Sequence, residues 1–259
     1  MERELREKDK IVLSWIHSNK FTTPSLYGAK FSKSASQIGF RMNLDRLYTY
    51  GFLHRVKKEY KHENTYYLTG KALRILSKEG RILLKRPTPV RVTFNQQDHD
   101  RRVIEMRTRL EADGTLGDVF WVTDFELRAG ITSKVKTAFL GGSLDVIKWR
   151  KHREAPSETS RRPDGYFQAT IEGERRSFVL EYIHAPYSTM KYNRVIPILI
   201  NKWASSIKLM VFQNDALTVR NKIYLKSHVR NRKNWWVASY DQVINKPFLE
   251  AFEDLSAGN

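Results

Sequence analysis

The 259-residue sequence predicts a two-domain protein of the α/β (α+β) class. Residues 1–86 show helical periodicity around one charged hairpin, and residues 90–259 alternate strand-like apolar runs with amphipathic helices. Between them, Lys85-Arg86-Pro87-Thr88-Pro89 places two prolines within three residues, which favours an extended, stiff linker. We therefore expect one domain over residues 1–86 and a second over residues 90–259.

The first domain reads as three helices, a hairpin and a further helix. Residues 5–18 and 34–50 have apolar side chains at helical spacing, and Thr22-Thr23-Pro24 resembles a helix start between them. The apolar faces consist of Leu5, Val12, Trp15 and Ile16 in the first helix and Phe40, Leu44 and Leu47 in the third. Gly51 ends the third helix, two strands follow over residues 52–69, and Gly70 opens the next helix.

This order is typical of a winged helix-turn-helix, in which the third helix enters the major groove and the hairpin is the wing. Basic and amide side chains off the buried helix face, or on the wing, are the expected DNA contacts. They are Arg41, Asn43, Arg46, Arg55, Lys57, Lys58 and Lys61. The alternative is a helical scaffold with a solvated hairpin.

Composition restricts the class of partner. Lys and Arg number 46 against 28 Asp and Glu, giving a formal charge of +18, which implies nucleic acid or an anionic membrane. No apolar run approaches the ~20 residues of a membrane span, and the N-terminus lacks a signal-peptide core. The absence of cysteine excludes zinc-finger, thiol and disulfide chemistry. We expect a cytoplasmic protein that binds DNA, with no membrane partner.

The second domain is expected to be a mixed sheet flanked by helices. A helix over residues 98–111 precedes a short apolar run at 120–122 and a hairpin with strands at 166–171 and 177–183. A helix from about Tyr192 to Trp203 contains Pro197, which kinks it or marks a late start. A strand at 208–212, a polar helix and a strand at 235–240 complete the pattern.

Two carboxylates sit where this hairpin would otherwise be apolar. Asp164 follows Pro163 at the mouth of the first strand, and Glu181 lies near the end of the second. Carboxylate oxygens suit Mg²⁺ or Mn²⁺, which lowers the pKa of bound water and neutralises charge on a scissile phosphate. The alternatives are a simple Pro-Asp-Gly turn and a structural ion pair of Glu181 with an arginine.

The element order resembles a PD-(D/E)xK nuclease core, with a helix, a hairpin carrying Asp and then Glu-x-Lys, a crossover helix and another strand. The sequence departs from that pattern at Ile183, which stands at the lysine position. Lys191 is the best substitute from the following helix, and Lys202 is the second. An acid of the first helix often joins such a site; Glu105 fits best, and Asp100 is the other candidate.

Three short stretches carry a more specific resemblance: His99-Asp100, Trp121 with Glu126-Leu127-Arg128, and Pro163-Asp164-Gly165 with Leu180-Glu181 and the segment 209–220. With the preceding winged helix, the chain is similar to the replication-relaxation family, which includes MobC-type relaxases of mobilisable plasmids and integrative elements. The resemblance implies a winged helix fused to a metal-dependent nuclease-like domain that acts on DNA at a transfer or replication origin. It also implies mobilisation or coupling proteins as partners.

By position, the resemblance makes Asp164 and Glu181 the metal ligands and assigns Lys191 to the phosphate. No two histidines are placed to form the metal site of His-hydrophobe-His relaxases, which makes that class a poor match. A tyrosine nucleophile stays open, with Tyr182, Tyr187 and Tyr192 nearest in sequence.

Further basic residues beside the predicted sheet are expected to hold backbone phosphates. They are Arg161, Arg162, Arg230, Arg232 and Lys233. Trp235-Trp236 offers either a base-stacking surface or core packing.

The leading hypothesis is a relaxase-like, metal-dependent DNA endonuclease that nicks one strand at a transfer or replication origin. The main alternative is a non-catalytic DNA-binding replication initiator or regulator with a degenerate nuclease fold. A third is an endonuclease that cuts both strands.

Overall fold

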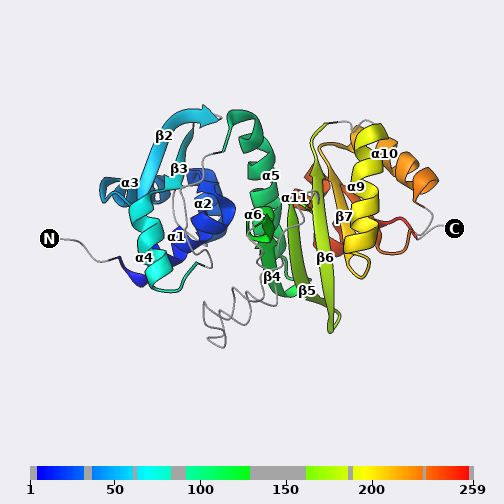
Figure 1. Ribbon diagram of the computed structural model, residues 1–259, viewed down its shortest axis with the longest axis horizontal. Coiled ribbons are helices and arrows are strands. Elements are labelled where there is room, and N and C mark those ends of the chain that lie inside the picture. Colours follow the sequence, from blue (N-terminus) through cyan, green and yellow to red (C-terminus); the bar gives the residue numbers. More distant parts are fainter. Residues whose placement is uncertain are drawn as a thin grey trace. The chain divides into compact units, whose positions relative to one another are not determined.

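The computed structural model describes residues 5–31, 37–60, 63–82, 92–128, 162–185, 189–229 and 232–256. The chain divides into two compact units, Met1–Ile104 and Glu105–Asn259 (Figure 1). The division falls within helix α5 (Phe94–Glu111), whereas the expected linker at residues 85–89 lies outside the described residues. At the level of fold class the prediction is confirmed, because the first unit has a three-stranded sheet with helices and the second a six-stranded mixed sheet with helices.

The first unit follows the predicted order of elements. Helices α1 (Glu7–Asn19), α2 (Pro24–Phe31) and α3 (Gln37–Thr49) precede the hairpin of β2 (Leu53–Tyr60) and β3 (Glu63–Leu68), and α4 (Gly70–Lys78) follows. A short strand, β1 (Phe21–Thr22), pairs with β3, so the sheet order is β1-β3-β2. The predicted apolar positions of α1 and α3 form one core with the inner face of α4.

Local signals in the sequence account for where these helices begin and end. Gly51 adopts a φ of 72°, and its N–H donates to Tyr48 at the end of α3. A left-handed residue is favourable there only when it is glycine. Thr69 caps α4, because its side chain accepts a hydrogen bond from the N–H of Ala72.

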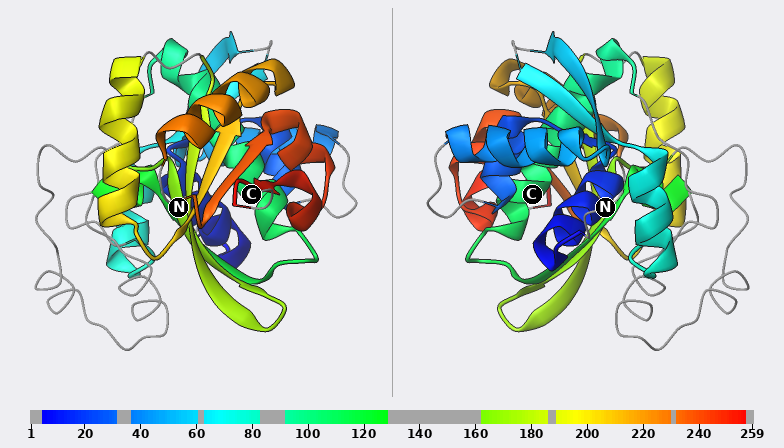
Figure 2. Two further views of the ribbon diagram at one scale, coloured as in Figure 1. Left: turned by 90° about the vertical axis from the view of Figure 1, so that its right-hand side faces the viewer. Right: turned by 90° about the vertical axis from the view of Figure 1, so that its left-hand side faces the viewer.

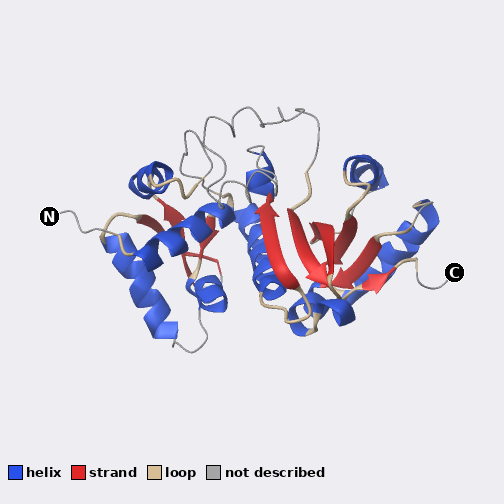
Figure 3. Ribbon diagram, turned by 90° about the horizontal axis from the view of Figure 1, so that it is seen from below, coloured by secondary structure: helices blue, strands red, loops and turns tan. Residues whose placement is uncertain are grey.

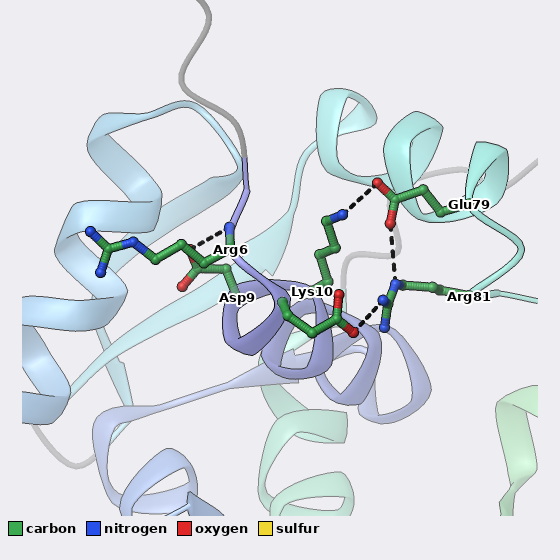
Figure 4. A network of polar contacts seen from close by, with 6 residues as sticks. Arg6, Asp9, Lys10, Glu79 and Arg81 are labelled. Atoms are coloured by element: carbon green, nitrogen blue, oxygen red, sulfur yellow. Dashed lines mark hydrogen bonds and ion pairs between the residues drawn. The ribbon is translucent and has the colours of Figure 1, made fainter.

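Ion pairs join the start of α1 to the chain beyond α4 (Figure 4). Glu79 contacts Lys10 at 2.8 Å and Arg81 at 3.2 Å, and Arg81 also pairs with Glu7. These groups are partly exposed, so each pair contributes about 0–1 kcal/mol to stability.

The second unit is built around a sheet in the order β4-β5-β6-β7-β8-β9. Strands β4 (Gly117–Thr123), β5 (Gly165–Ile171) and β6 (Glu174–Ile183) are antiparallel neighbours. Strands β7 (Ile207–Phe212) and β8 (Trp235–Ser239) continue the sheet parallel to β6, and the short β9 (Glu253–Asp254) closes it antiparallel to β8. Two helices, α9 (Thr189–Lys202) and α10 (Asp215–His228), form the crossovers between the parallel strands.

The two faces of this sheet carry different cores, and Figure 3 shows helices on both sides of the strands. On one face, Val179, Ile183 and Met210 pack with the buried positions of α9 and α10. The other face carries an aromatic stack, in which Phe167 lies 4.9 Å from Trp121 and 4.7 Å from Phe178, measured between ring centroids.

The predicted strands and helices of the second domain are present with small shifts at their ends. Helix α5 begins at Phe94, four residues before the expected start at Asp98. Helix α9 runs from Thr189 through Pro197, so the proline lies inside the helix. Of Trp235-Trp236, Trp235 is buried in the α9/α10 core, and Trp236 packs edge-on to Phe178. Both indoles therefore have packing roles.

Gly165 is needed for close packing of the sheet and lies in a strand. A Cβ atom at this position would meet the Trp121 ring at 2.4 Å. Gly165 is the first residue of β5 and pairs with Leu180 of β6. The glycine of Pro163-Asp164-Gly165 thus leaves room for an indole beside the strand that carries Asp164.

We predict that Gly165→Ala lowers the free energy of unfolding by ~1–3 kcal/mol, because the added methyl group overpacks against Trp121. Denaturant unfolding of the full chain measures this change. Gly114→Ala is the matched control, since a Cβ at Gly114 meets nothing within 4 Å. Adding Trp121→Phe to Gly165→Ala should recover part of the loss, and strict additivity of the two changes would contradict the packing explanation.

Candidate functional site

The β5–β6 register brings the two predicted metal ligands to adjacent strands. Gly165 pairs with Leu180, so Asp164, one residue before β5, comes opposite Glu181. The row extends to β4, because the N–H of Asp124 donates to the carbonyl of Asp164 at 3.2 Å. On the other side Glu181 pairs with Met210 of β7. Asp164 and Glu181 therefore lie side by side where β5 begins and β6 approaches its end.

Asp164 is held by the backbone of the neighbouring strand. Its Oδ2 atom accepts a hydrogen bond of 2.8 Å from the N–H of Tyr182. The contact fixes one carboxylate oxygen against β6, one residue beyond Glu181. The Asp164 carboxylate thus helps to pair β5 with β6, and the Tyr182 N–H fixes the position of its Oδ2 atom.

Glu181 is almost completely buried, with 3% of its surface exposed. Side chains alternate along a strand, so Glu181 shares a face with Val179 and Ile183, which belong to the α9/α10 core. Tyr166, two residues after Asp164, packs against the same core and lies 5.3 Å from Trp203 between ring centroids. Glu181 therefore points to the α9 side of the sheet.

Ile183 occupies the lysine position of the nuclease pattern and is fully buried against the α9/α10 core. The two substitutes, Lys191 and Lys202, both belong to α9, on the same side of the sheet as Glu181. Their side chains lie outside what the structure describes.

The two predicted helix acids have partners elsewhere. Glu105 accepts a hydrogen bond from the hydroxyl of Tyr240, whose ring lies 6.0 Å from that of Tyr182. Because Tyr182 and Glu181 point to opposite faces of β6, the structure places Glu105 on the face away from Glu181. In the first unit, Asp100 forms an ion pair of 3.0 Å with Lys20. Each acid is thus engaged by a partner of its own unit, Glu105 by Tyr240 and Asp100 by Lys20.

Within the described ranges, no group of three or more His, Asp or Glu side chains is arranged to hold one metal ion. The pair itself has the right donor chemistry, because both ligands supply carboxylate oxygen to a hard divalent cation. Glu126 follows β4, whose Thr123 pairs with Gly165. It accepts hydrogen bonds from the N–H and hydroxyl of Thr123 and so caps α6 (Asp124–Arg128). A divalent cation at this place would have two protein carboxylates and otherwise water or substrate as ligands.

The three candidate tyrosine nucleophiles are not equivalent. Tyr192 is buried in α9 and donates its hydroxyl proton to Asn221. Burial and the neighbouring Tyr224 raise the pKa of Tyr192 well above its usual value, which disfavours the phenolate needed for attack. Tyr182 is buried on the aromatic face of β6, and Tyr187 lies outside the described residues.

In the first unit, two predicted DNA contacts of α3 belong to an internal network. Arg46 forms an ion pair with the buried Asp9 of α1 and donates to the side-chain oxygen of Asn43 at 2.7 Å. Asn43 in turn donates to the hydroxyl of Tyr27 in α2. The ion pair raises the pKa of Arg46. These side chains join α3 to α1 and α2, a role that spacing in the sequence did not indicate.

Arg55, predicted as a wing contact, is also held within the unit. It donates to Asp45 at 3.0 Å, and its guanidinium lies 4.4 Å above the ring of Tyr48. Asp45 also accepts a hydrogen bond of 2.7 Å from the hydroxyl of Tyr66 on β3. The contacts orient Arg55 beside the outer face of α3.

Arg41 and Met42 are exposed side chains of α3. Arg41 is exposed, and Met42 has 68% of its surface exposed. Lys57 and Lys58 belong to β2, but their side chains lie outside the described part of the chain, as does all of Lys61. Of the predicted contacts in this unit, Arg41 is thus the basic residue that α3 presents to solvent.

The remaining basic candidates separate along the sheet. Arg162, half-buried, lies just before Asp164. Arg232 and Lys233 come just before β8. This segment lies beside the start of β7, because the N–H of Lys208 donates to the carbonyl of Asn234 at 2.7 Å. That is the end of β6–β8 opposite to the one where Glu181 lies. Arg161 and Arg230 lie outside the described residues.

Lys208 is a buried cation that sequence analysis read only as part of a strand. It is located on β7, two residues before Met210, on the same face as Glu181. Its Nζ donates to the carbonyl of Ala204 at 3.0 Å, and burial lowers its pKa. The alternation Lys208, Met210, Phe212 was the available signal, because it places a lysine on an otherwise apolar face.

Comparisons of this chain with protein-family models, with curated proteins and with solved structures found no match. Among the helices that the structure describes, none combines the length and the apolar character required to cross a membrane.

We predict that Arg46→Ala lowers the free energy of unfolding by ~2–4 kcal/mol, because it leaves the buried carboxylate of Asp9 without its cation. The loss in free energy of unfolding is smaller than the largest losses for fully buried ion pairs, because Arg46 is partly exposed. Thermal and denaturant unfolding measure the change. Arg41→Ala, one exposed arginine removed from the same helix, is the control and should stay within ~0.5 kcal/mol of the wild type.

Proposed function

We propose that this protein binds DNA and cleaves one DNA strand with a divalent metal ion. The observation that carries the proposal is the placement of Asp164 opposite Glu181 on neighbouring strands in a chain of formal charge +18. A carboxylate pair on two neighbouring strands suits a hard cation, and the basic chain suits a polyanionic substrate.

The element order of the second unit supports a nuclease-like, restriction-endonuclease-type fold. Helix α5 precedes the antiparallel strands β4, β5 and β6, and crossover helix α9 leads to the parallel strand β7. This order resembles that of a PD-(D/E)xK core, in which Asp164 and Glu181 would take the two acidic positions. The support is one of topology and position.

The first unit supports a winged helix-turn-helix as the DNA-reading part. Three helices are followed by the β2–β3 hairpin and α4, and α3 exposes Arg41 and Met42. Arg46 and Asn43 then position α3, and Arg41 makes the direct contact. A cation at the surface of such a helix meets base edges or phosphates.

Asp164 and Glu181 would hold Mg²⁺ or Mn²⁺. The ion, when bound, lowers the pKa of a water molecule and offsets negative charge on the phosphate. The Tyr182 N–H orients the Asp164 carboxylate toward this role, and α9 supplies the place from which Lys191 would face the phosphate. The resemblance to the replication-relaxation family implies that the DNA substrate is an origin of transfer or replication.

The second candidate function is DNA binding without cleavage, as in a replication initiator or regulator. The fully buried Ile183 favours it, because this position carries the lysine in the nuclease pattern. The winged helix would then act alone, and the Asp164–Tyr182 contact would be structural.

The cleavage proposal predicts that supercoiled plasmid DNA with a candidate origin is converted to open circles in Mn²⁺ or Mg²⁺. Asp164→Asn should reduce the rate by ~10²–10³-fold, because it removes charge but keeps an oxygen for the Tyr182 N–H. Asp118→Asn, an exposed carboxylate of β4, is the matched control and should cleave like the wild type.

Equal cleavage by wild type and Asp164→Asn would contradict the metal-site assignment. Wild-type protein that binds the DNA but does not nick it would support the second candidate. Denaturing electrophoresis after protease digestion then separates a covalent tyrosine intermediate from direct hydrolysis.

We further predict that Arg41→Ala weakens duplex binding without changing stability, and reduces the slope of log affinity against log salt by about one if Arg41 contacts a phosphate. Fluorescence anisotropy over a salt series measures both quantities. Arg74→Ala, an exposed arginine of α4, is the control for the loss of one positive charge. Equal weakening by both variants would contradict a specific role for α3.

A further inference from the structure

Helix α10 presents aliphatic side chains to solvent on the outer side of the second unit. Val219 is 61% exposed and Ile223 67% exposed, and they lie one helical turn apart on the same face. Asp215 and Ser227 follow at the same spacing toward the two ends of the helix and lie on opposite edges of this face. Figure 2 (left) shows α10, in orange, lying across the unit on the side turned to the viewer. The buried positions Asn221 and Leu225 attach the opposite face to the core.

Beside this stripe, the helix carries a negative side chain near its N-terminus and a positive one near its C-terminus. Asp215 lies in the first turn and Lys226 in the last. At 100° per residue both project to the same flank of the Val219–Ile223 stripe. Among the described residues neither has an ion-pair partner. The same flank carries Lys222, which pairs with Glu253, and it borders a cleft of about 280 Å³ between α10 and α12 (Phe248–Ala251).

We propose that α10 is a self-association surface, on which a second copy of the chain packs its own α10 antiparallel about a two-fold axis near Asn221. Val219 and Ile223 lie two residues before and after Asn221, so Val219 of one copy meets Ile223 of the other across the axis. In such an isologous contact like flanks face each other. Asp215 of one copy therefore meets Lys226 of the other, and the pair occurs twice.

Self-pairing matches this local charge pattern, because each copy supplies the lysine that meets Asp215 of the other. Antiparallel packing also brings the positive N-terminal end of each helix beside the negative C-terminal end of the other. The two exposed aliphatic residues bury little area, so the association is weak and depends on concentration.

Arg220 provides a contact that opposes association. It is exposed on the other flank of the stripe, where it would face its own counterpart near the two-fold axis. Like charges at this separation repel, and the repulsion is screened by salt. Arg220→Ala should therefore strengthen the association.

Sedimentation velocity of the full chain over a concentration series tests the proposal. The weight-average sedimentation coefficient of the wild type should rise with concentration, and Ile223→Asp should abolish the rise. Ile11→Asp is the matched control, because Ile11 is an isoleucine of α1 with 50% of its surface exposed. Thermal unfolding confirms that each variant is folded.

A charge exchange tests the antiparallel geometry. Asp215→Lys alone and Lys226→Asp alone should each weaken self-association, since each places like charges together. An equimolar mixture should regain it, because in the mixed dimer Lys at position 215 of one copy meets Asp at position 226 of the other, and the second contact keeps the original Asp215 with Lys226. A wild type that stays monomeric at every soluble concentration overturns the proposal. A mixture no more associated than the separate variants overturns the antiparallel arrangement.

Discussion

The antiparallel register between β5 and β6 is the constraint on which the candidate site depends. A shift of one residue would turn Glu181 to the aromatic face and take Asp164 away from it. Several contacts fix this register: the Tyr182 N–H on the Asp164 carboxylate, the stacking of Phe167 on Phe178, and the close approach of Trp121 to Gly165. The residues that pair the strands are thus the same residues that position the carboxylates, or their immediate neighbours.

Periodicity predicted most of the elements because burial is set by spacing. The core positions of α1 and α3, the strands of both hairpins and the helix through Tyr192 and Leu199 could be read in this way. Asp164 and Glu181 could be paired from the hairpin alone, since strand length and turn length fix which residues face each other. Element ends shifted by a few residues, as at α5, because the capping signals there are weak.

Contacts between elements distant in sequence could not be predicted by the same argument. Asn43 and Arg46 lie off the apolar stripe of α3, which made them candidate DNA contacts, yet Asp9 and Tyr27 lie within reach of them. Nothing in local spacing tells a solvent-facing arginine from one that meets a buried carboxylate of another helix. Glu105 is similar, because its partner Tyr240 follows β8, far along the chain.

Burial on the α9 side of the sheet limits how a cleavage site could be completed. Ile183 packs in the core, so its strand position offers no cation, and Lys208 directs its amine to Ala204 near the start of β7. Arg232 and Lys233 lie toward that same end of the sheet. Lys208, Arg232 and Lys233 therefore lie toward the end of the strands away from the carboxylate pair. Arg162 lies two residues before Asp164, and α9 covers the face that Glu181 shares with Val179 and Ile183. Under the proposed cleavage function, a lysine of α9 would take the role that the nuclease pattern gives to the strand lysine, and its presence would distinguish an active nuclease from a binding domain that kept only the acidic pair.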